Sequence, residues 1–462
     1  MDERLHALNR FGLGARIGEA RSLGDARAWL HDQLRGEPPP LRAELPDADA
    51  LGEALRGPRL ARGEEARQEA RRRLIGIARR ESRVALEARI ASDRPFVERL
   101  VAFWSNHLCV SGVGKLPVFA LAGSYEREAI RPHVLGRFED LVLASARHPA
   151  MLAYLDNAGS IGPASPAAQR GGGRGAPRGL NENYARELLE LHTLGVDGGY
   201  TQEDVQQLAR ILTGWTVAGL AGPNAGAAMR RRPGAQGRPD TSGPIGFEFA
   251  DALHEPGTKT LLGEMYREDG VREGERAIRA LCRHPSTARF MATKLVRHFI
   301  ADDPPAAAVD RVAAVFRDTE GDLRAVTATI VDLPEAWSAE HRKFRSPQEW
   351  LIATMRALNA ESIDDRLVAV LRQLRHPLWS PAAPDGFGDR LRDWADPDAL
   401  LNRAELARTL ARNLGADVDP RALLGVMHLP AGTPLAAELA NSAVPAAERV
   451  ALAFAGPAFQ WR

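Results

Sequence analysis

The residues with the most suggestive chemistry are three histidines and several carboxylates in the middle of the sequence. Neutral imidazoles and carboxylates together can hold a divalent metal ion such as Zn, Mn or Fe and leave one position open for a water molecule. Such a site requires that the fold gather side chains from distant positions into one pocket. The ligands of this hypothetical divalent metal ion would be His107, Asp156, Glu187, His192 and His254.

The same groups could work without a metal, because carboxylates and imidazoles also serve as general acids and bases. Arg131 or Lys259 would then bind an anionic substrate, since both side chains carry a positive charge. The candidates are Glu187, Glu190, His192 and His107 as catalytic residues, and Arg131, Asn183 and Lys259 as substrate-binding residues.

Each candidate also has a structural explanation. Asn183, Arg186, Glu187 and Glu190 fall on one helix face at spacings of three and four residues. Arg186 and Glu190 suit a salt-bridged, solvated face, and a buried polar cluster is the alternative. His192 falls in the last turn of the same helix, where a cation complements the helix dipole.

The helix that carries these residues is expected between Asn181, a suitable N-cap, and Gly195, a suitable stop. Thr201 and Asp204 then resemble a capping box that begins a second helix. Trp215 lies on the apolar face predicted for that helix. The two segments together predict a helical hairpin.

Helical patterns dominate the rest of the chain. Phe96, Leu100, Trp104 and Leu108 recur every four residues and predict a buried helix. The run from Ser346 to Glu349 is a further capping box, with a proline at the first helical position.

We therefore predict a mostly α fold, with one large multi-helix domain, a small β-hairpin insertion and two long Gly/Pro-rich loops. An N-terminal helical segment, 1–91, precedes the main helical domain, 92–462. Flexible loops are expected at 158–180 and 218–246, which contain seven glycines each. The β-hairpin is expected near 245–262, where apolar and polar residues alternate.

Composition excludes several classes of protein. The formal net charge of the 462 residues is +1, so no nucleic-acid partner is expected. No apolar run is long enough for a transmembrane segment. The chain begins Met1-Asp2-Glu3, without the basic region and apolar stretch of a secretory signal, which predicts a cytoplasmic protein. Cys109 and Cys282 are expected to be buried free thiols, with a single bridge as the alternative.

Several runs of residues resemble the bacterial family catalogued as domain of unknown function 1800. The resemblance extends from Asn9-Arg10-Phe11-Gly12 to the C-terminus. It rests on Phe103-Trp104-Ser105-Asn106-His107, on His148 to Asn157, on Asn181 to Thr201, on Leu212 to Thr216, on the His254 to Lys259 hairpin, on Gly321 to Ala325, on Lys343 to Glu349 and on Pro384-Asp385-Gly386.

The resemblance implies a family without an assigned activity. Its members are often exported with twin-arginine signals, which makes export to the cell envelope the alternative location. They are often encoded beside a sulfatase-like family of unknown function, number 1501, which implies a partner of that kind. The sequence departs from the family in lacking the export signal and in having Glu255, where an Asp more often follows the histidine.

Two functions follow from these observations. The first is an enzyme with a His/carboxylate polar pocket, with metal-assisted hydrolysis as one form of its chemistry. The alternative is a non-catalytic binding or scaffold partner of the sulfatase-like neighbour, in which arginines and tryptophans anchor the interface.

Overall fold

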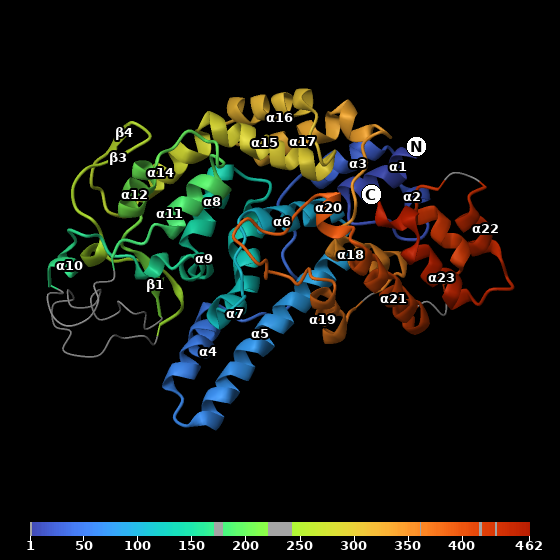
Figure 1. The fold of residues 1–462 in the computed structure, drawn as a ribbon, viewed down its shortest axis with the longest axis horizontal. Coiled ribbons are helices and arrows are strands. Elements are labelled where there is room, and N and C mark those ends of the chain that lie inside the picture. The colour runs from blue at the N-terminus through green and yellow to red at the C-terminus, as the bar shows by residue number, and fades with distance from the viewer. Residues whose placement is uncertain (1, 171–178, 220–242, 361, 415–417, 430–431) are drawn as a thin grey trace.

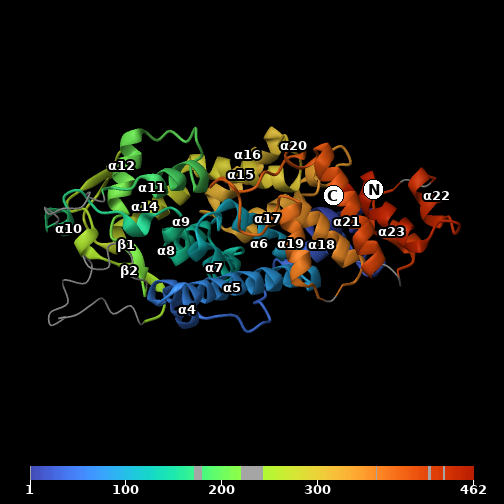
Figure 2. The ribbon, with the colours of Figure 1, turned by 60° about the horizontal axis from the view of Figure 1, so that its bottom comes forward.

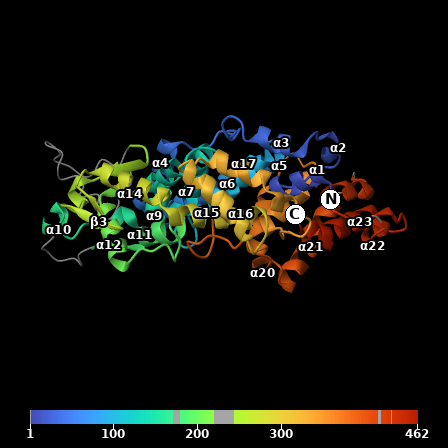
Figure 3. The same cartoon turned by 90° about the horizontal axis from the view of Figure 1, so that it is seen from above.

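The computed structural model describes residues 2–170, 179–219, 243–360, 362–414, 418–429 and 432–462. Within these ranges the chain is mostly helical, as predicted, with two small antiparallel strand pairs. Figure 1 shows an elongated molecule with both termini toward one end and the strands at the other, and Figure 2 and Figure 3 show the same arrangement from other sides. Large parts of both predicted Gly/Pro-rich loops, 171–178 and 220–242, lie outside the described residues.

The described residues before the first internal gap are helical. The α-helices are α1 (Glu3–His6), α2 (Glu19–Ser22), α3 (Ala26–Gln33), α4 (Ala48–Leu60), α5 (Glu64–Ala91), α6 (Pro95–His107), α7 (Leu116–Tyr125), α8 (Phe138–Arg147), α9 (Pro149–Tyr154) and α10 (Pro166–Arg170). The other helical turns are η1 (Ala7–Phe11), η2 (Glu126–Ile130), η3 (Arg131–His133) and η4 (Asn157–Gly159).

The middle of the chain adds the strands to further helices. Its elements are α11 (Asn183–Glu187), η5 (Leu188–His192), α12 (Gln202–Ile211), β1 (Trp215–Ala218), β2 (Gly246–Phe249), η7 (Asp251–Leu253), β3 (Lys259–Leu261), β4 (Glu264–Tyr266), α14 (Val271–Arg283) and α15 (Pro285–Phe299).

The last third of the described chain is again helical. Its elements are α16 (Ala306–Asp318), α17 (Leu323–Asp332), η8 (Pro334–Trp337), α18 (Pro347–Ala357), α19 (Asp365–Gln373), α20 (Leu391–Trp394), α21 (Pro397–Leu414), η9 (Pro420–Val426), α22 (Pro434–Ala440), α23 (Ala446–Ala455) and η10 (Pro457–Gln460).

Helices α5 and α6 organise the fold. Helix α5 forms an antiparallel hairpin with α4, visible in Figure 1, and packs against α7, α18 and α19. Helix α6 lies inside the molecule: its stripe residues Phe96, Leu100, Trp104 and Leu108 are at most 1% exposed, which confirms the predicted buried helix. The ring of Phe96 packs edge-on against that of Phe299 in α15, with centroids 5.7 Å apart. Helices α6 and α15 are therefore joined through the core.

The helix expected between Asn181 and Gly195 changes form halfway. It begins as α11 and ends as η5, a π-helical turn, before Gly195 terminates it at a φ of 87°. A π turn takes one residue more than an α turn, so it rotates the residues that follow it relative to the α-helical register. His192, the last residue of this turn, points into the core and is 1% exposed.

The capping box predicted at Thr201 and Asp204 is present and begins α12. The helix ends at Ile211, because Gly214 has a φ of 86° that turns the chain out of the helix. Trp215, predicted on the face of this helix, is instead the first residue of β1. That prediction was wrong because the helical spacing of apolar residues continues to Trp215, although the helix has already ended before Gly214.

A small β-hairpin is present, as predicted, but it is formed by β3 and β4, which are joined by Leu262 and Gly263, so it begins near the end of the predicted range 245–262 and extends past it. Both joining residues have positive φ, 51° and 80°, as a tight two-residue hairpin turn requires. Strand β2, which belongs to the range predicted for the hairpin, pairs with β1 instead. The ring of Phe247 in β2 lies 5.1 Å from that of Trp215 in β1, and this contact joins the two strands.

The C-terminal residues return to the centre of the molecule. The amide of Arg462 donates to the carbonyl of Lys343 at 2.8 Å, and the amide of Arg345 donates to the carbonyl of Gln460 at 2.8 Å. This pairing buries the guanidinium of Arg462.

Cys109 and Cys282 are both buried and free, as expected. In the described ranges no helix combines the length and the apolar character that crossing a membrane requires.

Gly14 provides a test of how closely the N-terminal segment packs on α18. A Cβ at Gly14 would lie 2.6 Å from the Cβ of Ala353, whereas a Cβ at Gly18 would meet nothing within 4 Å. Both glycines have positive φ, 108° and 83°. We predict that Gly14→Ala lowers the free energy of unfolding by about 3 kcal/mol and Gly18→Ala by about 1 kcal/mol, because only the first adds overpacking to backbone strain. Chemical denaturation of the two variants measures the difference, and equal losses would contradict the packing assigned to Gly14.

Candidate active site

A pocket of about 450 Å³ lies between α6, α15, the start of α18 and the segment 376–394, which we call the strap. Helix α6 contributes one face to it, with Arg99, Phe103, Asn106 and His107 at spacings of three and four residues. Helix α15 contributes Phe290, Lys294, Arg297 and His298 in the same way. Two rigid helices therefore form the walls, and the strap closes one side.

Hydrogen bonds fix the strap to the end of α6. The side chain of Asn106 donates to the carbonyl of Phe387 at 2.9 Å and accepts from its amide at 2.8 Å. The hydroxyl of Ser111 donates to the carbonyl of Pro381 at 2.6 Å. Gly386, at a φ of 82°, passes so close to Asn106 that a Cβ would lie 2.5 Å from its carbonyl oxygen. The strap is thus held in one position beside the pocket.

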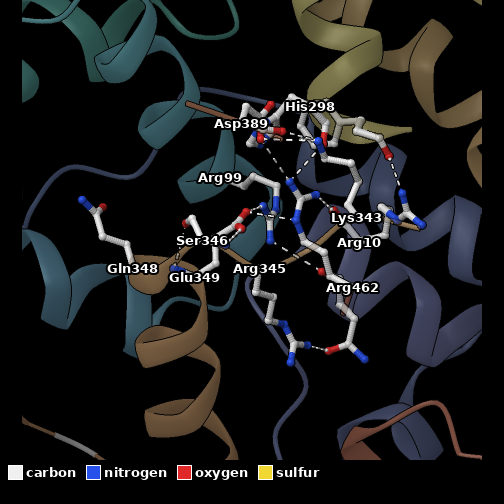
Figure 4. Close-up of polar contacts among 12 residues, drawn as sticks. Arg10, Arg99, His298, Lys343, Arg345, Ser346, Gln348, Glu349, Asp389 and Arg462 are labelled. Atoms are coloured by element: carbon white, nitrogen blue, oxygen red, sulfur yellow. Dashed lines mark hydrogen bonds and ion pairs between the residues drawn. The ribbon is translucent and has the colours of Figure 1, made fainter. Parts of the chain in front are cut away.

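Glu349 lines the pocket and belongs to a buried cluster of charged side chains (Figure 4). Its carboxylate accepts from the amide of Ser346 at 2.8 Å, which completes the predicted capping box. The same carboxylate pairs with the guanidinium of Arg99 and, at 3.1 Å, with that of Arg462. Burial by itself would raise the pKa of Glu349, but Arg462 and Arg99 outweigh it and hold the pKa well below 4.5. Glu349 is therefore a permanent negative charge that joins α6, α18 and the C-terminus.

Asp389 in the strap is the second acid of this cluster. Lys343 donates to its backbone carbonyl and lies 3.7 Å from its carboxylate, and Arg462 lies 3.9 Å from the carboxylate. Burial alone would raise the pKa of Asp389, but His298 and Lys343 outweigh it and lower the pKa. Asp389 is therefore ionised and can only accept hydrogen bonds.

His298, which also lines the pocket, lies next to the carboxylate of Asp389. Its Nδ1 lies 3.0 Å from Oδ2 of Asp389, and because Asp389 only accepts, Nδ1 must carry the proton. Burial lowers the pKa of His298 below 6.5 despite the opposing effect of Asp389, so the ring is neutral near neutral pH. Its Nε2 is then a bare lone pair, and this atom is buried without a hydrogen-bond partner among the described residues.

Lys294 lies one helical turn before His298 in α15. Its Nζ donates to Nδ1 of His107 at 3.0 Å, and Nε2 of His107 donates to the carbonyl of His192 at 3.2 Å. Burial lowers the pKa of Lys294 to about 8 and that of His192 to about 3. The lysine is therefore a charged group next to two neutral imidazoles at the pocket wall.

Among the predicted catalytic residues, the fold thus brings His107 and His192 together, with ring centroids 6.4 Å apart. Glu187 and Glu190 are only half-buried. Arg186 pairs with Glu190 at 3.3 Å and with Glu182 at 3.4 Å, as a salt-bridged helix face would require. Burial, followed by the charge of Glu190, raises the pKa of Glu187.

The predicted substrate-binding residues lie outside the pocket lining. Arg131 is buried and makes two hydrogen bonds to Glu98, at 2.6 and 2.8 Å. Asn183 is exposed, and its backbone N–H donates to the side-chain oxygen of Asn181 at 2.9 Å. Arg131 therefore joins η3 to α6, whereas the contact of Asn183 is local, at the start of α11.

Lys259, the third of these residues, forms a separate buried cluster with His254 and Glu273. Oε2 of Glu273 lies 3.1 Å from Nε2 of His254 and 3.1 Å from Nζ of Lys259. This cluster joins β3 to the first turn of α14.

The five proposed metal ligands are not gathered by the fold. Asp156 is exposed and pairs with Lys115 at 2.8 Å, and His254 belongs to the cluster with Glu273. Across the part of the chain that the structure describes, no three His, Cys, Asp or Glu side chains are grouped so that they could hold a metal ion. The described structure therefore contains no group of side chains that supports the predicted metal site.

We predict that Glu349→Gln lowers the free energy of unfolding by about 3–5 kcal/mol, because two buried guanidiniums lose their counter-charge. A glutamine keeps the size of the side chain and can still accept from Ser346, so the loss reports the charge. The control Glu203→Gln removes an exposed carboxylate 3.6 Å from Arg210 and should change stability by less than about 0.5 kcal/mol. Denaturation curves give both values, and a stable Glu349→Gln protein would show that the cluster does not need this charge.

The comparisons with known proteins identify a family and nothing more specific. No curated protein and no solved structure matches the sequence. A family model described as Protein of unknown function (DUF1800) matches residues 6–461, nearly the whole chain. The chain belongs to the DUF1800 family.

Proposed function

We propose that this protein is an enzyme in which His298 acts as a general base in the pocket between α6, α15 and the strap. The observation that carries the proposal is the buried Nε2 of His298, which has no hydrogen-bond partner in the described structure while Asp389 holds Nδ1. A neutral imidazole that is oriented through one nitrogen and bare at the other is suited to remove a proton from a water or hydroxyl group.

Hydrolysis is the reaction class that this arrangement supports best. Nε2 of His298 would take a proton from water, and the hydroxide would attack an electrophilic centre of the substrate. The ammonium group of Lys294 would stabilise the negative charge that develops. His298 would then return the proton to the leaving group, which restores the neutral ring.

Asp389 is a positioning residue in this proposal. Its ionised carboxylate keeps the proton of His298 on Nδ1 and fixes the plane of the ring. It acts through His298 and makes no contact with the substrate.

A panel of chromogenic esters, phosphate esters, sulfate esters and glycosides tests the proposal. We predict that His298→Asn lowers kcat/KM by at least about 100-fold on whichever class is turned over, because general base catalysis contributes effects of about that size. The matched control is His31→Asn, which disrupts an exposed His–Asp pair, His31 with Asp332 at 2.8 Å, away from the pocket. Equal activity of the two variants, or no turnover of any class by the wild-type protein, would contradict the proposal.

The pH dependence of kcat/KM gives an independent test. The rate should rise with pH through the lowered pKa of His298, below 6.5, because the base must lose its proton. It should fall again near pH 8, where Lys294 loses its charge. Lys294→Met should abolish the alkaline decrease and leave the acid limb in place. An alkaline limb that persists in Lys294→Met would show that another group controls it.

A further inference from the structure

The cations that line the pocket divide into two groups. Arg89 pairs with Glu126 at 2.7 Å, Arg99 pairs with Glu349, and Arg392 lies 3.9 Å from Asp393, so these charges have counter-charges within the protein. The second group makes no ion pair within 4 Å in the part of the chain that the structure describes. It consists of Lys294, Arg297 and Arg390.

These three cations converge on the pocket from two sides. Lys294 and Arg297 lie on neighbouring turns of α15, and Arg390 belongs to the strap. Burial and then the charge of Arg390 lower the pKa of Arg297, and Asp389, Asp302 and Asp303 oppose this decrease. Nε of Arg297 is buried without a hydrogen-bond partner among the described residues.

The acids that line the pocket form no ion pair within 4 Å with these three cations in the described chain. Glu126 and Glu349 pair with Arg89 and Arg99, and the carboxylate of Asp389 lies 3.7 Å from Lys343 and 3.9 Å from Arg462. Asp393 accepts from the amide of Arg390 at 2.9 Å and lies 3.9 Å from Arg392. This leaves Asp385 as the lining carboxylate without an ion pair in the described chain. The pocket therefore carries an excess of positive charge.

We propose that the pocket binds the oxyanion group of its substrate, a phosphate, sulfate or carboxylate, on Arg297 and Arg390, with Lys294 beside them. Guanidiniums bind such groups through pairs of parallel hydrogen bonds. Like charges held close together in a part-buried pocket repel each other, and a bound anion removes this repulsion. The proposal rests on the proposed function, since it names the substrate class of the same site.

The cations lie next to the proposed base and its positioning residue in the sequence. Arg297 is adjacent to His298 in the sequence, and Arg390 follows Asp389. The residues that would bind the anion thus come from the same two elements as the proposed base and its positioning residue. A pocket of about 450 Å³ has the size of a small-molecule site.

Isothermal titration calorimetry at constant ionic strength tests the proposal, with sodium phosphate, sulfate and acetate as separate probes. Saturable binding of at least one probe is expected. Tighter phosphate or sulfate binding indicates a tetrahedral group on the substrate, and tighter acetate binding indicates a carboxylate. Arg297→Gln and Arg390→Gln should each weaken binding about tenfold or more, because each removes a charge-assisted hydrogen bond to the anion.

The control is Arg289→Gln, on the same helix, where the guanidinium is exposed and pairs with Asp310 at 2.8 Å. This variant should bind the anion as the wild-type protein does. Absence of saturable binding for all three probes, or equal weakening in Arg289→Gln, would overturn the proposal.

His298→Asn separates this proposal from the proposed function. It should keep anion binding within about twofold of wild type while turnover is lost, because His298 is the base and not an anion ligand. Anion binding with full turnover in His298→Asn would refute the proposed base alone. Loss of turnover in His298→Asn without anion binding by the wild-type protein would refute the anion site alone.

Discussion

The structure depends on the buried carboxylate of Glu349. It closes the capping box of α18 and at the same time neutralises Arg99 of α6 and Arg462 at the C-terminal end of the chain. A buried charge that has no partner lowers the stability of the folded protein far more than a paired one. Because each guanidinium comes from a different segment, these segments can be buried together only in an arrangement that brings both to Glu349. The cluster therefore couples the packing of distant parts of the sequence (Figure 4).

The same charge cluster also holds polar side chains of the pocket in place. Asp389 interacts with Lys343 and Arg462 on one side and with His298 on the other, so the cluster and the proposed base share one carboxylate. The strap that carries Asp389 is fixed to α6 through Asn106. As a consequence, His298 is held through Nδ1, while its Nε2 has no hydrogen-bond partner among the described residues. The charge cluster that stabilises the fold therefore also fixes the ring that carries the proposed base.

The sequence predicted the helical fold and the buried stripe of α6, because both follow from local periodicity and capping. It also named His107 and His192, whose rings the fold brings to 6.4 Å of each other, and of these two His107 lines the pocket. It missed His298 and Asp389, since they are 91 residues apart and no local pattern connects a helix position with a position in an irregular strap. One signal was present: only four lysines stand against 57 arginines, and Lys294 and Lys343 both lie at this site. The predicted sulfatase-like partner stays a prediction.

The protonation state of His298 is the most direct test of its assignment as a neutral general base oriented by Asp389. Nitrogen-15 NMR of histidine-labelled protein distinguishes a neutral ring with its proton on Nδ1 from the other tautomer and from the charged ring. Assignment of the signal follows from its disappearance in a His298 variant. We predict that, near neutral pH, His298 is neutral and carries its proton on Nδ1, facing Asp389. A proton on Nε2, or a charged ring at that pH, would contradict it.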